Sequence, residues 1–263
     1  MIINIVGGRG VMGSMHKRIF EKYGHEVIIS GRASNPSIEE AAKQSDISII
    51  SVPISATEET IRKVALYCKA IADFTSFKKM PIDAMLKYTK KGAEVVGIHP
   101  LYGNVDSISG QTIIVCKTPR TGKICNELIE CLKKEGATII EMSPEEHDKK
   151  VFSINQVLRI RELMAYAKTM TNLGYSIKEM YELSPPPTKT IIELLARQIN
   201  DKNDDLYDEF IKNDLFLDEA EREFTKNFKE TKKDYIKIAS ELRKNIGKEF
   251  LEELQKKAKD KIE

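Results

Sequence analysis

Histidine and cysteine are both scarce in this sequence, with four of each among 263 residues. The cysteines are Cys68, Cys116, Cys125 and Cys131. They form no C-x-x-C pair, and no histidine lies at metal-ligand spacing from them, so the sequence does not indicate a metal site. We therefore expect reduced thiols in the core of a cytoplasmic protein.

A dominant charge and a long apolar run are also missing. The 42 Lys and Arg residues nearly balance the 40 Asp and Glu residues, and both signs are spread along the chain. This balance argues against a nucleic-acid or membrane partner. No run approaches the roughly 18 apolar residues of a membrane span, and the opening MIINIVGG lacks the basic segment of a signal peptide.

Seven short apolar runs in the first 142 residues are predicted to be strands: IINIV, EVIIS, ISIISV, AIADF, AEVVGI, QTIIVC and ATIIEM. Segments of helical length, such as residues 12–23 and 57–67, separate most of them. Strands that are apolar on both faces and alternate with helices indicate a parallel sheet covered on both sides. The predicted fold class of residues 1–143 is therefore α/β, with a doubly wound sheet.

The pattern changes after residue 143, where no further strand is convincing. Ser143 as N-cap, Pro144 at the first helical position and Glu146 three residues after the cap form a capping box with a proline start. An apolar-periodic stretch then runs to about residue 173, and SPPPT at 184–188 interrupts the helical pattern. Residues 144–263 are thus predicted to form a separate, all-helical domain.

The tail carries one apolar stripe at steps of three, four or seven residues: Phe224, Phe228, Tyr235, Ile238, Leu242, Ile246 and Phe250. This spacing predicts one face of a long helix. Such a face needs a partner, and either helix pairing within a homodimer or packing within one chain would bury it.

A glycine motif follows the first predicted strand. GGRGVMG places Gly8, Gly10 and Gly13 in G-x-G-x-x-G register, and a second strand follows at residues 26–30. This context is that of a Rossmann dinucleotide-binding domain. Gly8 permits a sharp turn, Gly10 lets the backbone approach a pyrophosphate, and Gly13 lets helix and strand pack closely. The helix N-terminus would then face the phosphates.

The end of the second strand bears on the choice of cofactor. An NAD site usually has an Asp or Glu there, but this chain has Ser30, Gly31 and Arg32. A guanidinium with nearby hydroxyls suits a 2′-phosphate, which favours NADP over NAD unless Arg32 is a solvated surface residue. The other expected cofactor contacts are Arg9, Val11, Met12, Val52 and Pro53.

His99 lies at the end of the predicted strand AEVVGI, on the carboxyl edge where parallel sheets bind ligands. Imidazole titrates near neutrality and can take the proton of a hydroxyl as hydride leaves the same carbon. A lone histidine after a strand is more often structural, so the residue type alone leaves both roles open.

Four segments resemble the prephenate and arogenate dehydrogenase (TyrA) family, in that family's order and spacing. GIHPLYG, with His99, resembles its HPMFG loop, and DFTSFKK, with Ser76, resembles its D-x-x-S-V-K loop. EEHDKK, with His147, is similar to the EHD motif that opens the family's helical domain. SPPPTKTIIELLARQI resembles its SSP…R…R helix, with Lys189 and Arg197 on the two basic positions.

The resemblance covers most of the chain, more loosely in the C-terminal helices. It implies a Rossmann domain followed by a helical dimerisation domain. The implied reaction is NAD(P)-dependent oxidative decarboxylation of prephenate, or of arogenate, towards tyrosine. The resemblance also implies that His99 contacts the ring hydroxyl, that Ser76 orients substrate and nicotinamide, and that Arg197 holds a carboxylate.

One position departs from the family pattern. Twelve residues after the EHD histidine the family has another histidine that points into the substrate site, whereas this chain has Arg159. An arginine could still hold a carboxylate there, while His147 could equally be structural. The expected substrate contacts are therefore Arg197, Arg159, Lys189 and His147. The remaining histidines, His16 and His25, are expected on the surface.

Two other interpretations stay open. SGR after the second strand also resembles coenzyme F420-dependent NADP oxidoreductases, which would not need HPLYG. The missing second histidine would fit a catalytically inactive dinucleotide-binding regulator, although the presence of His99, Ser76 and Arg197 argues against it. The sequence thus predicts an NADP-linked oxidoreductase acting on a small molecule, with NAD as the alternative cofactor.

Overall fold

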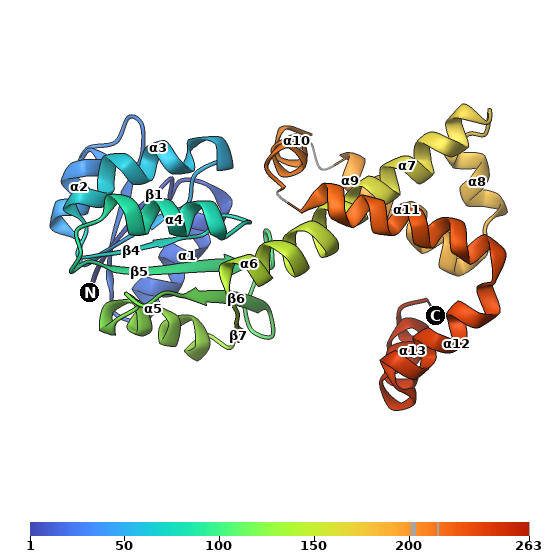
Figure 1. The fold of residues 1–263 in the computed structure, drawn as a ribbon. Helices are drawn as coiled ribbons and strands as arrows, with labels where there is room; N and C mark the ends of the chain where they lie inside the picture. The colour runs from blue at the N-terminus through green and yellow to red at the C-terminus, as the bar shows by residue number, and fades with distance from the viewer. Residues whose placement is uncertain (201–203, 215, 263) are drawn as a thin grey trace. The chain divides into compact units, whose positions relative to one another are not determined.

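A computed structural model describes residues 1–200, 204–214 and 216–262 of the chain (Figure 1). The chain forms two compact units, Met1–Phe152 and Ser153–Glu263. The domain boundary at residues 143 and 144 that the sequence suggests stays a prediction.

Seven strands form the sheet of the first unit, in the order β2-β1-β3-β4-β5-β6-β7. They are β1 (Ile2–Val6), β2 (Glu26–Ser30), β3 (Ile47–Ile50), β4 (Ala70–Asp73), β5 (Glu94–Pro100), β6 (Thr112–Lys117) and β7 (Thr138–Glu141). Each apolar run that was predicted to be a strand forms one of them. The predicted Rossmann-type α/β fold, followed by a helical region, is confirmed.

The β5–β6 pair is antiparallel, with His99 opposite Ile114, so the prediction of a fully parallel sheet was wrong at this place. Residues 101–111 between the two strands contain no helix. A parallel pair needs a crossover of a dozen or more residues, usually a helix, whereas an antiparallel pair needs only a loop. The chain after β5 therefore turns back at once, and its loop stays at the carboxyl end of β5.

Helices cover both faces of the sheet (Figure 1). α1 (Val11–Lys22) and α5 (Lys123–Lys134) pack on one face. α2 (Ile38–Gln44), α3 (Ile54–Val64) and α4 (Lys79–Tyr88) pack on the other, and the short η1 (Ala65–Tyr67) follows α3. Because α1 and α3 leave β1 and β3 towards opposite faces, a crevice is expected between the carboxyl ends of these strands.

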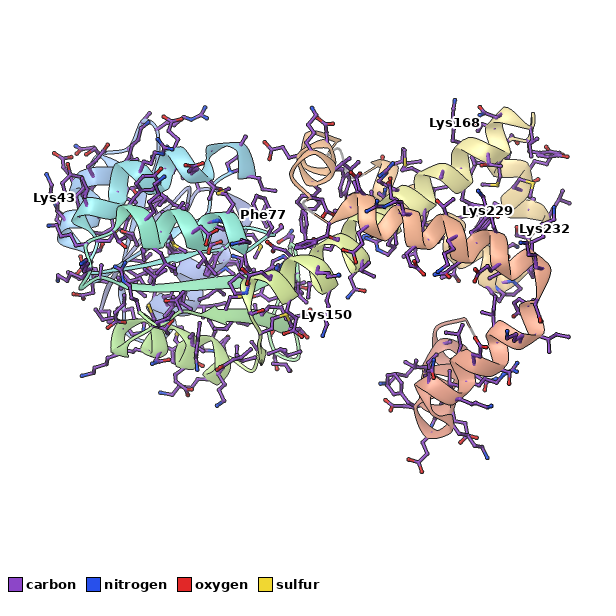
Figure 2. The ribbon with its side chains drawn as sticks, viewed as in Figure 1. Lys43, Phe77, Lys150, Lys168, Lys229 and Lys232 are labelled. Carbon is purple, nitrogen blue, oxygen red and sulfur yellow. The ribbon has the colours of Figure 1, made fainter. Side chains whose placement is uncertain are left out.

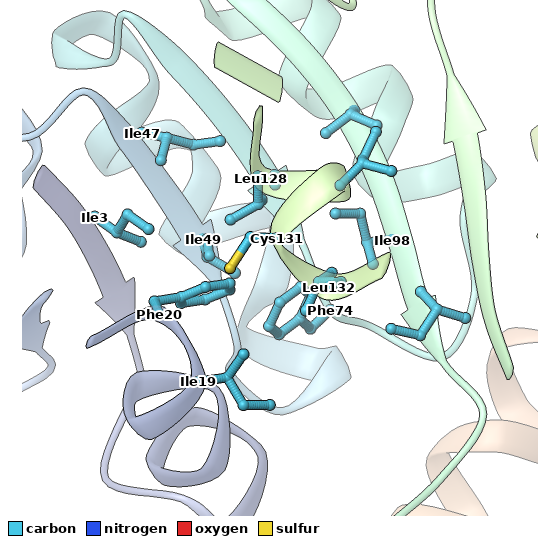
Figure 3. Packing of buried hydrophobic residues seen from close by; sticks show 14 of the residues in the cluster. Ile3, Ile19, Phe20, Ile47, Ile49, Phe74, Ile98, Leu128, Cys131 and Leu132 are labelled. Atoms are coloured by element: carbon cyan, nitrogen blue, oxygen red, sulfur yellow. The ribbon is translucent and has the colours of Figure 1, made fainter. Parts of the chain in front are cut away.

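The core beneath α1 and α5 consists of large apolar side chains, among them Phe20, Ile49 and Leu128 (Figure 3). All three are fully buried. Complete burial of a side chain of this size stabilises a fold by roughly 1.5–3 kcal/mol. The four cysteines are buried and unbridged, as the sequence predicted.

A helical stretch leads out of the sheet. It consists of α6 (Pro144–His147), η2 (Asp148–Leu158), which is π-helical, and α7 (Arg159–Asn172). The Ser143 hydroxyl accepts a hydrogen bond from the Glu146 backbone N–H at 3.1 Å, so the predicted N-cap is confirmed. π-Helical turns are rare and often occur at functional sites.

The second unit contains only helices among its described residues: α7, α8 (Ile177–Leu183), α9 (Pro186–Asn200), α10 (Asp204–Asn213), α11 (Leu217–Lys233), α12 (Tyr235–Ile246) and α13 (Lys248–Ile262). Exposed lysines such as Lys168, Lys229 and Lys232 extend from α7 and α11 (Figure 2). In the part of the chain that the structure describes, no helix has the length and apolarity needed to cross a membrane.

The single long tail helix predicted from the apolar stripe was wrong. Asp234 and Gly247 divide the tail into α11, α12 and α13. The Asp234 carboxylate accepts a hydrogen bond from the Lys237 backbone N–H at 3.0 Å, which starts a new helix. Gly247 follows the last residue of α12 with φ +88° and ψ 142°, a conformation that glycine adopts more readily than other residues.

Candidate active site

The glycine loop after β1 leaves no room for side chains at two of its positions. A Cβ on Gly13 would lie 2.3 Å from Gly8 Cα, and a Cβ on Gly8 would lie 2.3 Å from Ile29 Cδ1. A Cβ on Gly10 would meet only Gly7 O, at 3.5 Å, so this side of the loop is open. The loop thus has the close packing and the accessible backbone that a pyrophosphate site requires.

Gly7 is a further residue of this loop, and it was not among the residues predicted to contact the cofactor. Its φ is +83°, and an added Cβ would lie 2.3 Å from Ser51 O at the end of β3. The double glycine in GGRG was the available signal, because the residue before the motif must also adopt a conformation that other residues avoid.

A pocket of about 540 Å³ opens at the carboxyl ends of β1, β2 and β3. Val6, Gly31, Arg32, Val52 and Pro53 belong to its lining. Arg32 is exposed in the pocket wall, and Lys63 and Glu59 in the same wall form an ion pair at 2.6 Å. The pocket has the size and the cation expected of a site for a dinucleotide.

Ser30 contributes to the fold below this pocket. It is buried, and its Oγ donates a hydrogen bond to Asn4 Oδ1 at 2.7 Å. Its carbonyl accepts a hydrogen bond from the Gly7 backbone N–H at 2.8 Å. Arg9, Val11 and Met12 lie in the glycine loop and the first turn of α1, exposed or half-buried.

His99 lies one residue before the end of β5 and is only 4% exposed. Its Nδ1 is 2.8 Å from Nε2 of His147, a residue far away in the sequence at the end of α6. Nδ1 of His147 is in turn 2.8 Å from Oδ1 of Asp148. The structure therefore joins two of the predicted site residues in one buried chain of hydrogen bonds, Asp148–His147–His99.

Asp148 also binds the start of α4. Its Oδ1 accepts a hydrogen bond from the Lys78 backbone N–H at 2.7 Å, and its Oδ2 accepts one from the Lys79 N–H at 2.9 Å. These N–H groups would otherwise lack partners, because the first turn of a helix has none within the helix. The carboxylate thus fixes the chain after β4 to the end of α6.

Burial lowers the pKa of both histidines. The pKa of His99 lies well below its usual value of 6.5 because of burial, with smaller effects of His147 and the Lys78 ammonium. Burial also lowers the pKa of His147, and its hydrogen bond to Asp148 opposes the shift. Both rings are therefore neutral at neutral pH, the state in which an imidazole can accept a proton.

A buried ion pair lies beside these rings. The Lys78 ammonium contacts the Asp73 carboxylate and donates a hydrogen bond to Ile98 O at 3.0 Å. Burial raises the pKa of Asp73, and Lys78 counteracts this effect. Ser76 is half-buried in the same loop, which connects β4 to α4.

The predicted substrate cations lie in the second unit. Arg197 is exposed on α9, and Lys189 is half-buried two turns earlier on the same helix, over the ring of Tyr181 at 5.2 Å. Arg159 is exposed at the start of α7, where its Nε donates a hydrogen bond to Asn155 O at 3.3 Å. Its neighbour Arg161 forms an ion pair with Glu221.

The prediction that His16 is on the surface was wrong. The residue is fully buried in α1, with its ring centroid 4.5 Å from that of Phe74. Nδ1 donates a hydrogen bond to Met12 O at 2.8 Å, and Nε2 accepts one from the Tyr102 hydroxyl at 3.1 Å. Its position within the apolar face of α1 was the signal that could have placed it in the core.

His25, also predicted on the surface, is half-buried. Its Nδ1 lies 3.2 Å from the amino group of Met1. Among the described residues, no group of histidine, cysteine, aspartate and glutamate side chains is arranged to hold a metal ion.

Comparisons with known proteins bear on this site. A family model described as "Prephenate dehydrogenase, nucleotide-binding domain" matches residues 11–141, which include Gly13, Ser76 and His99. The chain is 29% identical to the probable arogenate/prephenate dehydrogenase of Methanocaldococcus jannaschii, over 95% of this chain and 62% of that protein. It is 30% identical to the T-protein of Haemophilus influenzae, over 74% of this chain and 52% of that protein. The chain thus spans only about half to three-fifths of these relatives.

A solved structure shares the fold over the whole chain. The prephenate dehydrogenase of Aquifex aeolicus, crystallised with hydroxyphenyl propionate and NAD+, superposes with a TM-score of 0.71. The match covers 100% of this chain and 97% of that one, at 18% sequence identity.

Proposed function

The chain belongs to the prephenate/arogenate dehydrogenase (TyrA) family, and we propose that it catalyses the NAD(P)-dependent oxidative decarboxylation of prephenate or arogenate, a step of tyrosine biosynthesis. The observation that carries the proposal is the buried, neutral His99 at the carboxyl end of β5, within the region that the family model matches. The match covers the nucleotide-binding domain, and it supports binding of a nicotinamide dinucleotide.

In the proposed reaction His99 is the proton acceptor. A bound nicotinamide cofactor supplies the acceptor for hydride. As hydride leaves C4 of the substrate ring, His99 Nε2 takes the proton of the C4 hydroxyl, and the O–H electrons form the carbonyl. The ring carboxylate then leaves as carbon dioxide, and its bonding electrons pass through the ring to the C4 carbonyl oxygen. The ring becomes aromatic, and the resulting phenolate recovers a proton. Ser76 is proposed to orient the substrate hydroxyl and the nicotinamide.

The substrate has two negatively charged groups to bind in this proposal. Arg197 is assigned to one carboxylate, since a guanidinium donates two parallel hydrogen bonds to a carboxylate. Arg159 and Lys189 are assigned to the rest of the substrate site, as the resemblance to the family suggests. His147, which the resemblance also places there, is fully buried with both ring nitrogens hydrogen-bonded to Asp148 and His99, so it is assigned to support His99 instead. Arg159, where the family has histidine, makes this pocket different from the usual one.

We further propose NADP as the preferred cofactor. Arg32 directly follows Gly31 after β2 and lies in the pocket wall, where a 2′-phosphate would need a cation. The relative from Aquifex aeolicus was crystallised with NAD+, so the preference for NADP is proposed for this chain alone and needs its own test.

Arg32→Ala should raise KM for NADP at least tenfold and leave KM for NAD nearly unchanged. Arg62→Ala, on α3 and paired with Glu58, is the matched control. A wild-type preference for NAD would refute the assignment.

A homodimer in the cytoplasm completes the proposal. The helices of the second unit expose large apolar side chains, among them Phe228 at 69%, Tyr235 at 71% and Ile236 at 79%. A second copy of the chain could bury them. The cytoplasmic location stays a prediction from the sequence.

The function is tested by following cofactor reduction and carbon dioxide release with prephenate and with arogenate. We expect turnover of at least one substrate, with equal amounts of reduced cofactor and carbon dioxide. Cofactor binding without turnover of either substrate would contradict the proposal and favour a catalytically inactive regulator. Reduction of NADP by a different donor, such as reduced coenzyme F420, would favour the other class of oxidoreductase.

A further inference from the structure

We propose that Asp148 and His147 are positioning residues, which act through hydrogen bonds to give His99 the tautomer with its lone pair on Nε2 and to stabilise the cation that His99 becomes. The proposal rests on the proposed role of His99 as proton acceptor. It assigns to the EHD segment a role in proton transfer, in place of the substrate contact or the purely structural role considered from the sequence.

The direction of the hydrogen bonds follows from Asp148. Its two carboxylate oxygens accept hydrogen bonds from the backbone N–H groups of Lys78 and Lys79, which can only donate. The N-terminus of α4 also favours a negative charge at this place. An ionised carboxylate can only accept, so Nδ1 of His147 must carry the hydrogen that it donates over 2.8 Å.

The other three ring nitrogens are then determined in turn. With its hydrogen on Nδ1, a neutral His147 has a lone pair on Nε2 and accepts a hydrogen bond there. The donor is Nδ1 of His99, at 2.8 Å. A neutral His99 with its hydrogen on Nδ1 has its lone pair on Nε2. No hydrogen-bond partner for Nε2 occurs within the described part of the chain, so this nitrogen is available to a substrate hydroxyl.

The same chain of hydrogen bonds stabilises the protonated, positively charged form of His99. When Nε2 gains a proton, a positive charge forms in a place from which water is excluded and close to the Lys78 ammonium. Both effects disfavour the cation. Through His147 the imidazolium is hydrogen-bonded towards a carboxylate, and a buried charge-assisted hydrogen bond is stronger than the same bond in water. His147 is fully buried and Asp148 only 4% exposed, so water cannot replace this support.

Other features of the structure fit a positioning role. Asp148 fixes α4 and the end of α6 together, so the ring of His147 is held by rigid elements. The rings of His99 and His147 meet edge to face, with centroids 5.0 Å apart and an interplanar angle of 67°. Preorganised groups of this kind cost little reorganisation during a reaction.

The tautomer can be observed directly by nitrogen-15 NMR of the histidine rings in the wild-type protein, without substrate. We expect His99 to show a protonated Nδ1 and an unprotonated Nε2. Asp148→Asn replaces the charged acceptor of His147 by a neutral amide, whose oxygen at the Oδ1 position must also accept from the Lys78 N–H. The preference of His147 for a hydrogen on Nδ1 therefore weakens, and we expect mixed tautomers of both rings. Asp83→Asn, an exposed acid of α4 paired with Lys79 at 2.9 Å, is the matched control and should leave the signals unchanged.

The kinetic consequence is a selective loss of kcat. We expect Asp148→Asn to lower kcat on the order of a hundredfold or more, with a much smaller change in KM, because the cation formed on His99 loses its carboxylate and part of the base has the wrong tautomer. Since Asp148 also caps α4, His147→Phe is a second variant that keeps the capping carboxylate. It should give mixed His99 tautomers and a similar loss of kcat.

The outcomes separate this proposal from the proposed function. A protonated Nε2 on His99 in the wild type would overturn the positioning roles of Asp148 and His147. Unchanged His99 signals and kcat in both variants would overturn them too. The expected wild-type signals and mixed His99 tautomers in both variants, together with no turnover of prephenate or arogenate, would support the positioning roles of Asp148 and His147 and refute the proposed function instead.

Discussion

His16 shows how burial can make a single residue sensitive to pH. Burial lowers its pKa to about 4, from about 6.5 in an unfolded chain. Below pH 6.5 the unfolded state therefore binds a proton that the folded state does not, and the free energy of unfolding falls as the pH drops towards 4. A shift of this size corresponds to about 3 kcal/mol.

We therefore predict that His16→Phe, combined with Tyr102→Phe to avoid an unpaired hydroxyl, removes part of the acid sensitivity. Between pH 7 and pH 4 the variant should lose about 3 kcal/mol less free energy of unfolding than the wild type. Urea unfolding at the two pH values measures this difference. Identical losses in both proteins would show that His16 is not held neutral by the fold.

Arg197 is the residue assigned to substrate affinity. Removing a charge-assisted contact to a carboxylate costs about 1.5–3 kcal/mol. Arg197→Ala should therefore raise KM for the substrate roughly tenfold to a hundredfold and change kcat much less. Steady-state kinetics decide this, with the exposed Arg243→Ala of α12 as the control. A collapse of kcat at constant KM would contradict the assignment.

The histidines also show what single residues in a sequence can reveal. His99 could be singled out because it follows a strand, and strand ends gather at one edge of a sheet. Its partner His147 lies 48 residues away on another element, and no local pattern records which side chains meet across such a distance. His16 was misplaced because its polarity was weighed above its position in an apolar helical face.

Among the elements, the glycine loop and α1 depend on each other most closely. Gly13→Ala would place a Cβ 2.3 Å from Gly8 Cα, and backbone atoms cannot yield as a flexible side chain can. We predict a loss of about 1–3 kcal/mol in the free energy of unfolding, together with weaker cofactor binding. Thermal or urea unfolding and a cofactor titration measure the two effects.

Gly10→Ala is the matched comparison, because its Cβ would meet only Gly7 O at 3.5 Å. It should leave the stability of the cofactor-free protein nearly unchanged and still weaken cofactor binding, since the backbone must approach the pyrophosphate there. Equal effects of both substitutions on stability would contradict the account of this loop.

The elements themselves were largely predictable from the sequence. Each strand is an apolar run bounded by polar residues, and this local pattern was sufficient. The antiparallel β5–β6 pair was missed because strand direction depends on the connection, and residues 101–111 give no positive signal for a loop of this type. The tail was read as one helix because the apolar stripe outweighed Asp234 and Gly247, whose capping signals are short.

At the scale of the whole molecule, the tail helices suggest self-association. Ile236 is 79% exposed at the start of α12, next to Tyr235, which is 71% exposed. We predict a dimer in sedimentation experiments and a shift towards monomer in Ile236→Lys, with Lys237→Ala as a neighbouring control. A wild-type protein that is monomeric at micromolar concentration would contradict the prediction.

The proposed division of labour places the cofactor and the proton acceptor in the first unit and the substrate cations in the second. His99 is the residue on which this account depends most. The most direct test is the kcat of His99→Asn with the substrate that the wild type turns over, measured together with its affinity for the cofactor. His25→Asn, outside the site, is the control. We predict a loss of kcat of roughly a hundredfold or more at unchanged cofactor affinity, as expected when a general base is removed. An unchanged kcat would contradict the central claim.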